Sequence, residues 1–142
     1  MFHTGIVKIT TNTKGQLAVS KAELRAFELG YIPSRPLFDS RYDLVIDDGK
    51  HLSRLQVKYA NGKSSNADGA IVVKLEYVDR KKNIYTYQNS EVDALVVYIP
   101  RIDKLCFFPR TIFVGKKKLS IRIAPSINNQ KKRIIAAKDY YW

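Results

Sequence analysis

The sequence predicts an α+β fold in which helices flank a mixed central sheet. Three observations lead to this prediction. One segment near the N-terminus has apolar residues at helical spacing, several later segments have the patterns typical of strands, and no repeat or linker divides the 142 residues. A chain of this length buries about two thirds of the surface that it exposes when unfolded. We therefore expect a single domain, residues 1–142, with one hydrophobic core.

The predicted helix covers residues 16–29, where leucine, alanine and phenylalanine recur at intervals of three and four. Gly30 follows at a position that favours the end of a helix. Residues 32–41 contain two prolines, which exclude a helix and predict an extended segment. The chain then enters the predicted sheet.

A β-hairpin at residues 42–58 is the clearest strand signal. Two alternating segments flank an Asp48-Gly49 pair, and such a pair predicts a tight turn between antiparallel strands. The polar segments 60–69 and 79–93 are expected to project from the sheet as loops. The C-terminal segment, about 110–142, has two basic clusters and a short helix that ends in aromatic residues. Further strands are predicted at residues 70–78, 94–100, 104–109 and 119–123.

The chain is strongly basic. Lysine and arginine total 25 against 13 aspartate and glutamate, so the formal net charge is +12. Solubility requires a net charge of only about 2 to 8, so this excess favours a polyanion such as nucleic acid as a partner. A basic nucleic-acid-binding protein without catalytic chemistry, such as a ribosomal protein, has a similar charge and stays as an alternative.

The sequence also predicts a soluble, intracellular protein. Cys106 is the only cysteine, and its apolar surroundings indicate a small buried hydrophobic residue rather than a nucleophile. No apolar segment is long enough to span a membrane, and the N-terminal residues lack the apolar core of a signal peptide.

Three common kinds of catalytic site find no support. His3 and His51 lie 48 positions apart and have no zinc-ligand spacing. No serine stands in a nucleophile-elbow motif, and no glycine-rich phosphate-binding loop is present. The remaining candidate lies on the hairpin.

Asp43 begins the first strand of this hairpin. When the strands pair across the turn, Asp43 lies beside the end of the second strand. Gln56 and Lys58 in that strand point to one face, and Val57 between them points to the other. A carboxylate, an amide oxygen and an ammonium group are therefore expected to converge.

This combination suits the hydrolysis of a phosphodiester, which requires a divalent cation, a polarised water and stabilisation of developing negative charge. Asp43, the side-chain oxygen of Gln56 and the backbone carbonyl of Val57 are hard oxygen ligands suited to Mg²⁺. Lys58 is placed to orient the water and to stabilise the charge. An ordinary ion pair between Asp43 and Lys58 across a surface hairpin is the structural alternative.

The hairpin sequence YDLVIDDGKHLSRLQVK resembles the active-site hairpin of the PD-(D/E)xK nuclease superfamily. The preceding helix, the Arg-Pro segment and the later VYIP and CFFP sequences occur in the same order in a small bacterial branch of that superfamily. Within it, the nearest resemblance is to the group I intron-encoded homing endonuclease of cyanobacteria. The resemblance covers about residues 14–142. It implies a restriction-endonuclease-like core and a metal-dependent, site-specific double-strand DNA endonuclease.

The resemblance assigns the central metal-binding acid to Asp43, the usual acidic position of the motif to Gln56 and the motif lysine to Lys58. It implies Mg²⁺ as cofactor, with Mn²⁺ as a substitute. Glutamine in place of an acid is expected to weaken metal binding. A structure-specific nuclease similar to Holliday-junction resolvases would use the same residues and is the alternative enzyme.

A second departure concerns the first helix, where the family commonly has a glutamate. Ala18 and Val19 stand at that place, and Glu23 lies one turn beyond Val19. A natural loss and an engineered inactivating substitution both explain the missing acid. We expect this chain to bind DNA and to be impaired in cleavage.

One active site cuts one strand, so double-strand cleavage requires at least a homodimer, and a long target favours a dimer of dimers. A location in the bacterial cytoplasm, associated with the nucleoid, follows from a DNA substrate. Basic residues dispersed along the chain are expected to contact DNA phosphates: Arg35, Arg41, Lys63, Lys81, Lys82, Lys116, Lys117, Lys118, Lys131, Lys132 and Arg133.

Overall fold

The computed structural model describes residues 9–61, 63–64, 67–88, 91–125 and 135–142. Its elements follow one another as α1 (Thr11–Glu28), β1 (Ile32–Ser34), β2 (Leu44–Asp47), β3 (Leu52–Tyr59), β4 (Lys63–Ser64), β5 (Ala67–Lys74), β6 (Tyr77–Val78), β7 (Ile84–Tyr85), β8 (Ala94–Ile99), β9 (Lys104–Pro109), α2 (Arg110–Phe113), β10 (Lys118–Arg122), β11 (Ile135–Ala136) and the 3-10 helix η1 (Ala137–Tyr140).

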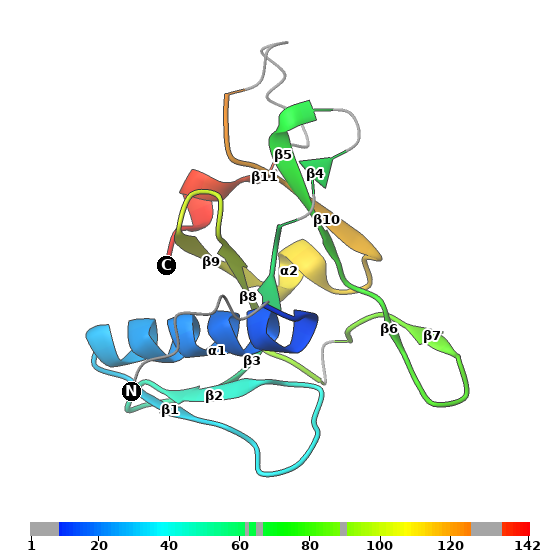
Figure 1. The fold of residues 1–142 in the computed structure, drawn as a ribbon. Helices are drawn as coiled ribbons and strands as arrows, with labels where there is room; N and C mark the ends of the chain where they lie inside the picture. The colour runs from blue at the N-terminus through cyan, green and yellow to red at the C-terminus, as the bar shows by residue number, and fades with distance from the viewer. Residues whose placement is uncertain (1–8, 62, 65–66, 89–90, 126–134) are drawn as a thin grey trace, which may run out of the picture.

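The central sheet has five strands in the order β1-β2-β3-β8-β9 (Figure 1). β3 and β8 are parallel, and the other neighbouring strands are antiparallel. A second sheet has the order β11-β10-β5-β4, and β6 pairs with β7 in a separate two-stranded ribbon. The predicted α+β fold with a mixed central sheet is confirmed.

The two faces of the central sheet are covered by different elements. One face packs against the small residues of α1 through Leu44, Leu55 and Val96. The other face packs against the second sheet and α2. The buried residues therefore form two clusters, one on each face of the central sheet, and the expectation of one core is wrong. All six residues of β8 are buried, since this strand lies inside the sheet and is covered on both faces.

Helix α1 begins at Thr11, five residues before the predicted start. The side chain of Thr10 caps the helix by accepting a hydrogen bond from the N–H of Thr13. Residues 11–15 include threonine, asparagine and glycine, and the low helix propensity of these residues conceals the start of the helix in the sequence. The predicted end is confirmed, because Gly30 has a φ of 81° just beyond the helix.

The hairpin turn follows the prediction closely. Gly49 has a φ of 89°, which side chains with a Cβ rarely adopt. The Asp47 carboxylate accepts from the N–H of Gly49, and the Asp48 carboxylate accepts from the N–H groups of Lys50 and His51. These bonds hold the turn at one register, which places Leu44 opposite Leu55.

The expectation that residues 60–69 and 79–93 project as loops is wrong in part. β4 and the start of β5 lie in the first segment and belong to the second sheet. The second segment contains β7 and two buried residues, Tyr87 and Val92. Both segments are rich in turn-forming residues, so the sequence pattern did not indicate these strands and buried residues.

The strand predicted at residues 70–78 is divided into β5 and β6, which belong to different sheets. The strands β8, β9 and β10 agree with the sequence. β8 and β9 form the predicted pair, β10 matches residues 119–123 within a residue, and the C-terminal helix is the 3-10 helix η1. Cys106 is fully buried as expected, and burial raises the pKa of its thiol to about 11.

The turn provides a test of the hairpin. Gly49→Ala is expected to destabilise the protein by about 1–2 kcal/mol, because alanine is strained at positive φ. Gly15→Ala, within α1 and with open space around its Cβ position, is expected to stabilise it by about 0.5–1 kcal/mol. Urea unfolding of both variants measures the difference, and equal or greater stability of Gly49→Ala would contradict this account of the turn.

Candidate active site

The site is built where β2 and β3 stop pairing. The N–H of Asp43 donates to the carbonyl oxygen of Leu55 at 2.8 Å. The N–H of Val57 then donates to Oδ2 of Asp43, also at 2.8 Å. The carboxylate therefore replaces the next backbone partner of β3, and Asp43 lies beside the end of β3 as the sequence predicts.

Alternation along β3 separates its side chains. Leu55 and Val57 belong to the cluster packed against α1. Lys58 points to the opposite face, where its Nζ lies 5.6 Å from the centre of the Tyr87 ring. Gln56 is half-buried and shares this face with Lys58 by the alternation of the strand.

Burial opposes the charge of both ionisable groups. Desolvation raises the pKa of Asp43, and the Val57 N–H, Lys58 and Arg35 oppose that rise. Desolvation lowers the pKa of Lys58, and the charge of Asp43 opposes that fall. Each charged form therefore depends on the other, which is typical of active sites.

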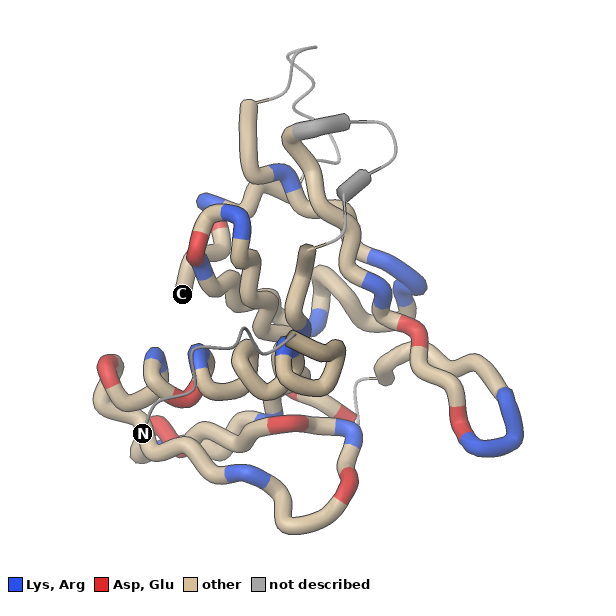
Figure 2. Tube along the Cα trace, viewed as in Figure 1, with Lys and Arg blue, Asp and Glu red and all other residues tan. Residues whose placement is uncertain are grey.

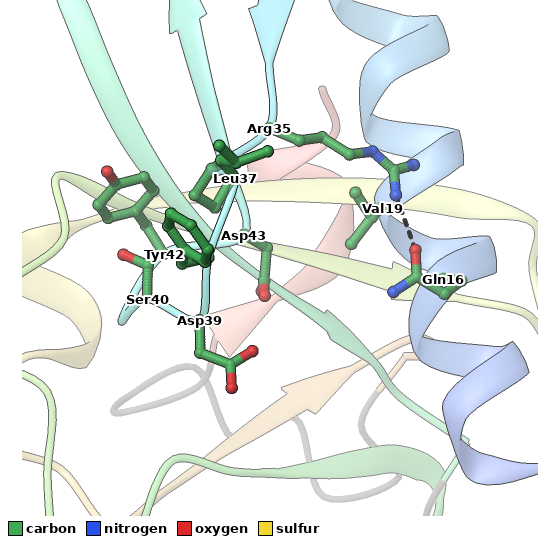
Figure 3. A pocket seen from close by; sticks show the side chains of 10 residues that line it. Gln16, Val19, Arg35, Leu37, Asp39, Ser40, Tyr42 and Asp43 are labelled. Carbon is green, nitrogen blue, oxygen red and sulfur yellow. Dashed lines mark hydrogen bonds between the residues drawn. The ribbon is translucent and has the colours of Figure 1, made fainter.

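An open pocket of about 450 Å³ adjoins Asp43. Figure 3 shows its walls: Gln16 and Val19 come from α1, and the remaining side chains come from the segment 35–43. Gln56 and Lys58 do not line this pocket, so Asp43 stands between the pocket and the β3 side chains.

No carboxylate of α1 lines the pocket. Ala18 has no exposed surface, and Val19 forms part of the wall. Glu23 binds the guanidinium of Arg35. Glu23 is therefore engaged elsewhere and does not replace the missing acid of the first helix.

The oxygen donors near Asp43 suit a hard divalent cation. Within a strand the N–H and C=O of one residue point to the same side, so the Val57 carbonyl is directed toward Asp43. Asp43, Gln56 and Val57 offer few ligands, and Mg²⁺ commonly retains several waters. Within the described part of the chain, no three His, Cys, Asp or Glu residues form a metal-binding group. The exposed carboxylate of Asp39 also lines the pocket, and sequence reasoning missed it.

Two of the predicted phosphate contacts near the site have protein partners. Arg35 joins its loop to α1, donating to Gln16 at 2.7 Å and to Glu23 at 3.0 Å. The guanidinium carbon of Arg41 lies 3.9 Å from the centre of the Tyr77 ring. Both residues position the segment that leads to Asp43, and their contact with DNA stays a prediction.

The other described basic residues lie on other elements of the fold. Lys81 and Lys82 are exposed on the β6–β7 turn, and Lys116, Lys117 and Lys118 are exposed where β10 begins (Figure 2). Lys63 lies in β4. Lys131, Lys132 and Arg133 fall outside the described residues.

Sequence reasoning missed two supporting residues. Tyr87 is buried under Lys58, and burial, followed by the charge of Asp43, raises the pKa of its phenol to about 12. Asp93 accepts from the backbone N–H of Arg54 at 2.7 Å and pairs with the side chains of Arg54 and Arg110. The alternating sequence IYTY is a weak strand signal for Tyr87, whereas Asp93 gave no signal.

Comparison with known proteins identifies the family of the chain. A family model described as PD-(D/E)XK endonuclease matches residues 9–142. The chain belongs to the PD-(D/E)XK endonuclease family. Members of this family generally use divalent metal ions. Among the described residues, no helix is long and apolar enough to cross a membrane.

Two solved structures are similar over most of the chain. The bacterial homing endonuclease I-Ssp6803I has 26% identity and a TM-score of 0.74, with 93% of this chain and 88% of that chain covered. Hjc, a Holliday junction resolvase of the archaeal hyperthermophile Archaeoglobus fulgidus, has 13% identity and a TM-score of 0.50, with 77% and 84% covered. A comparison with curated protein sequences finds no match.

Positions 18 and 19 of α1 differ in the surroundings that a glutamate side chain would have. Ala18→Glu is expected to cost at least about 2 kcal/mol more than Val19→Glu, because position 18 is enclosed and position 19 borders the pocket. Chemical denaturation measures both, with Ala18→Gln and Val19→Gln as uncharged controls of the same length. Equal stability of the two glutamate variants would contradict this difference between the two positions.

The raised pKa of Asp43 predicts that removing its carboxylate increases the stability of the protein in a pH-dependent way. Above the ordinary carboxyl pKa of 3.8, the ionised Asp43 is less favourable in the folded than in the unfolded protein. Asp43→Asn is therefore expected to raise the melting temperature by a few degrees at pH 7 in EDTA, while its amide oxygen still accepts from Val57. The gain should disappear as the pH falls below 3.8, where both proteins are neutral at this position. Loss of stability at pH 7 would contradict the direction of the shift.

Proposed function

We propose that this PD-(D/E)XK family member is a metal-dependent, site-specific double-strand DNA endonuclease of the intron-homing type. The hydrogen bond that holds the Asp43 carboxylate at Val57, next to Lys58, is the observation that carries the proposal. The likeness to a homing endonuclease at 26% identity over 93% of the chain supports the homing type.

Asp43, Gln56 and the Val57 carbonyl would hold Mg²⁺, with Mn²⁺ as a substitute. When bound, the ion supplies neutralisation of phosphoryl oxygens and acidification of a water molecule. Lys58 would orient a water molecule and stabilise the negative charge that develops on the phosphate. Its half-buried position strengthens this interaction, because little solvent competes.

The alanine and valine on α1 are central to the proposed activity of this chain. A glutamate there would add a second carboxylate to a site whose only charged ligand is Asp43. We infer that the chain as written binds DNA and cleaves slowly. The side-chain amide of Gln56 carries no charge, so metal binding is weaker and depends more strongly on Asp43.

Double-strand cleavage would require two copies of this site, and we propose a homodimer or a dimer of dimers. The basic loops would contact phosphates, and the bacterial cytoplasm, near the nucleoid, would be the working location. A structure-specific nuclease is the alternative enzyme, because the resolvase likeness at 13% identity shows a shared fold. A non-catalytic binder is the second alternative, with Asp43 and Lys58 as a simple ion pair.

Cleavage assays of the restored acid test the function. Ala18→Glu and Val19→Glu are incubated with randomised plasmid DNA and Mg²⁺, and the cut ends are sequenced. Val19→Glu is expected to cleave about 100-fold faster than the unaltered chain, because its carboxylate borders the pocket. Adding Lys58→Ala should abolish this gain, and adding Lys50→Ala, at the exposed turn of the same hairpin, should not.

The pattern of cuts separates the readings. Cuts at one recurring site support the homing endonuclease. Cuts at four-way junctions, whatever their sequence, would instead support the structure-specific nuclease. DNA binding that is indifferent to Mg²⁺, without cuts in any variant, would favour the non-catalytic binder.

A further inference from the structure

Tyr77, the first residue of β6, contacts its partner strand β7, the segment that follows β7 and the distant Arg41. Its ring lies 3.9 Å from the Arg41 guanidinium carbon. It stacks on Tyr85 at a centroid distance of 5.4 Å and contacts Tyr87 at the same distance in a tilted arrangement. Its hydroxyl is 3.2 Å from a carboxylate oxygen of Glu91, to which it donates a hydrogen bond. Tyr77 is therefore the central contact of this group.

Two of these contacts lead directly to the candidate active site. Tyr87 lies under the Lys58 ammonium, whose Nζ is 5.6 Å from the ring centre. Arg41 stands two residues before Asp43. Tyr77 thus connects the β6–β7 hairpin to the segment that carries Asp43, just before β2, and through Tyr87 to Lys58 of β3.

The β6–β7 hairpin presents a basic tip. Asp79 accepts from the N–H groups of Lys81 and Asn83, and also from the Tyr85 hydroxyl. These bonds lower the pKa of Asp79 and direct its charge into the turn. Arg80, Lys81 and Lys82 are exposed, and Figure 2 shows this tip projecting from the rest of the molecule.

The basic surface continues from the hairpin toward β10. The N–H of Leu75, two residues before β6, donates to the carbonyl oxygen of Lys117 at 2.9 Å. The exposed run Lys116–Lys118 therefore lies beside the root of the hairpin (Figure 2). Two clusters of cations on adjoining elements match the repeated charges of a nucleic-acid backbone better than a single acidic group.

We propose that the β6–β7 hairpin is a DNA-binding arm that contacts backbone phosphates beside the cut site, held at a fixed position relative to Lys58 by Tyr77. This inference rests on the proposed function, because it places the arm beside a bound duplex. Fixing the arm before binding reduces the entropy lost when its side chains meet the phosphates.

Salt-dependent binding tests the arm without cleavage or a known target. Fluorescence anisotropy measures affinity for a non-specific duplex in EDTA across a series of salt concentrations. Arg80→Gln/Lys81→Gln is compared with Lys104→Gln/Lys138→Gln, which removes the same charge from exposed positions on β9 and η1. Lys82 is left in place because its φ of 65° is part of the turn.

The arm variant is expected to reduce the slope of log affinity against log salt by about 0.9 for each lost phosphate contact, a total of about 1–2. The control should leave the slope unchanged. Equal slopes for both variants and the unaltered protein would overturn the arm while the endonuclease proposal stands. Failure of the unaltered protein to bind duplex DNA would overturn both.

Tryptic digestion tests the role of Tyr77. Duplex DNA should protect the 80–82 tip of the unaltered protein from trypsin. Without DNA, Tyr77→Leu should increase the rate of cleavage at this tip several-fold, and Tyr77→Phe, which keeps the ring contacts, should not. Equal rates in the leucine and phenylalanine variants would show that Tyr77 does not hold the arm.

Discussion

The hydrogen bond from the Val57 N–H to the Asp43 carboxylate is the interaction on which the site depends. It forms at the point where the backbone pairing of β2 and β3 ends. The side chain of Asp43, the residue just before β2, thus accepts the hydrogen bond that the backbone of a longer β2 would otherwise accept. The carboxylate gains a fixed position from a rigid sheet, and Lys58 follows one residue later on the same strand. Catalytic geometry set by a sheet is more precise than geometry set by loops.

The partly buried surroundings of this bond disfavour the charged forms of Asp43 and Lys58. Each of these charged forms stabilises the other. Tyr87 closes the underside of Lys58 with an aromatic ring. A phosphate or a cation entering the site would meet groups whose charges are poorly satisfied by water, which increases the strength of their interaction with it.

The hairpin could be predicted because its signals are local. Alternation and one Asp-Gly pair determine the turn, the register and the position of Asp43. The true start of α1 was hidden because Thr10 provides a cap to residues of low helix propensity. Arg35 and Arg41 were interpreted by charge alone, whereas Glu23 and Tyr77, their partners in the fold, come from distant segments. Tyr87 was missed for the same reason, since its burial depends on contacts with other elements.

The position of the β6–β7 hairpin in the chain has an evolutionary consequence. It lies within the crossover between the parallel strands β3 and β8, which themselves remain adjacent in the central sheet. Parallel strands require a long connection, and its length is set by topology rather than by catalysis. Insertions or substitutions in this crossover can change the surface offered to a target while the paired strands keep the reacting groups in place. Under the proposed function, the DNA-facing surface of this segment can therefore diverge without a matching change in the segments that hold Asp43 and Lys58.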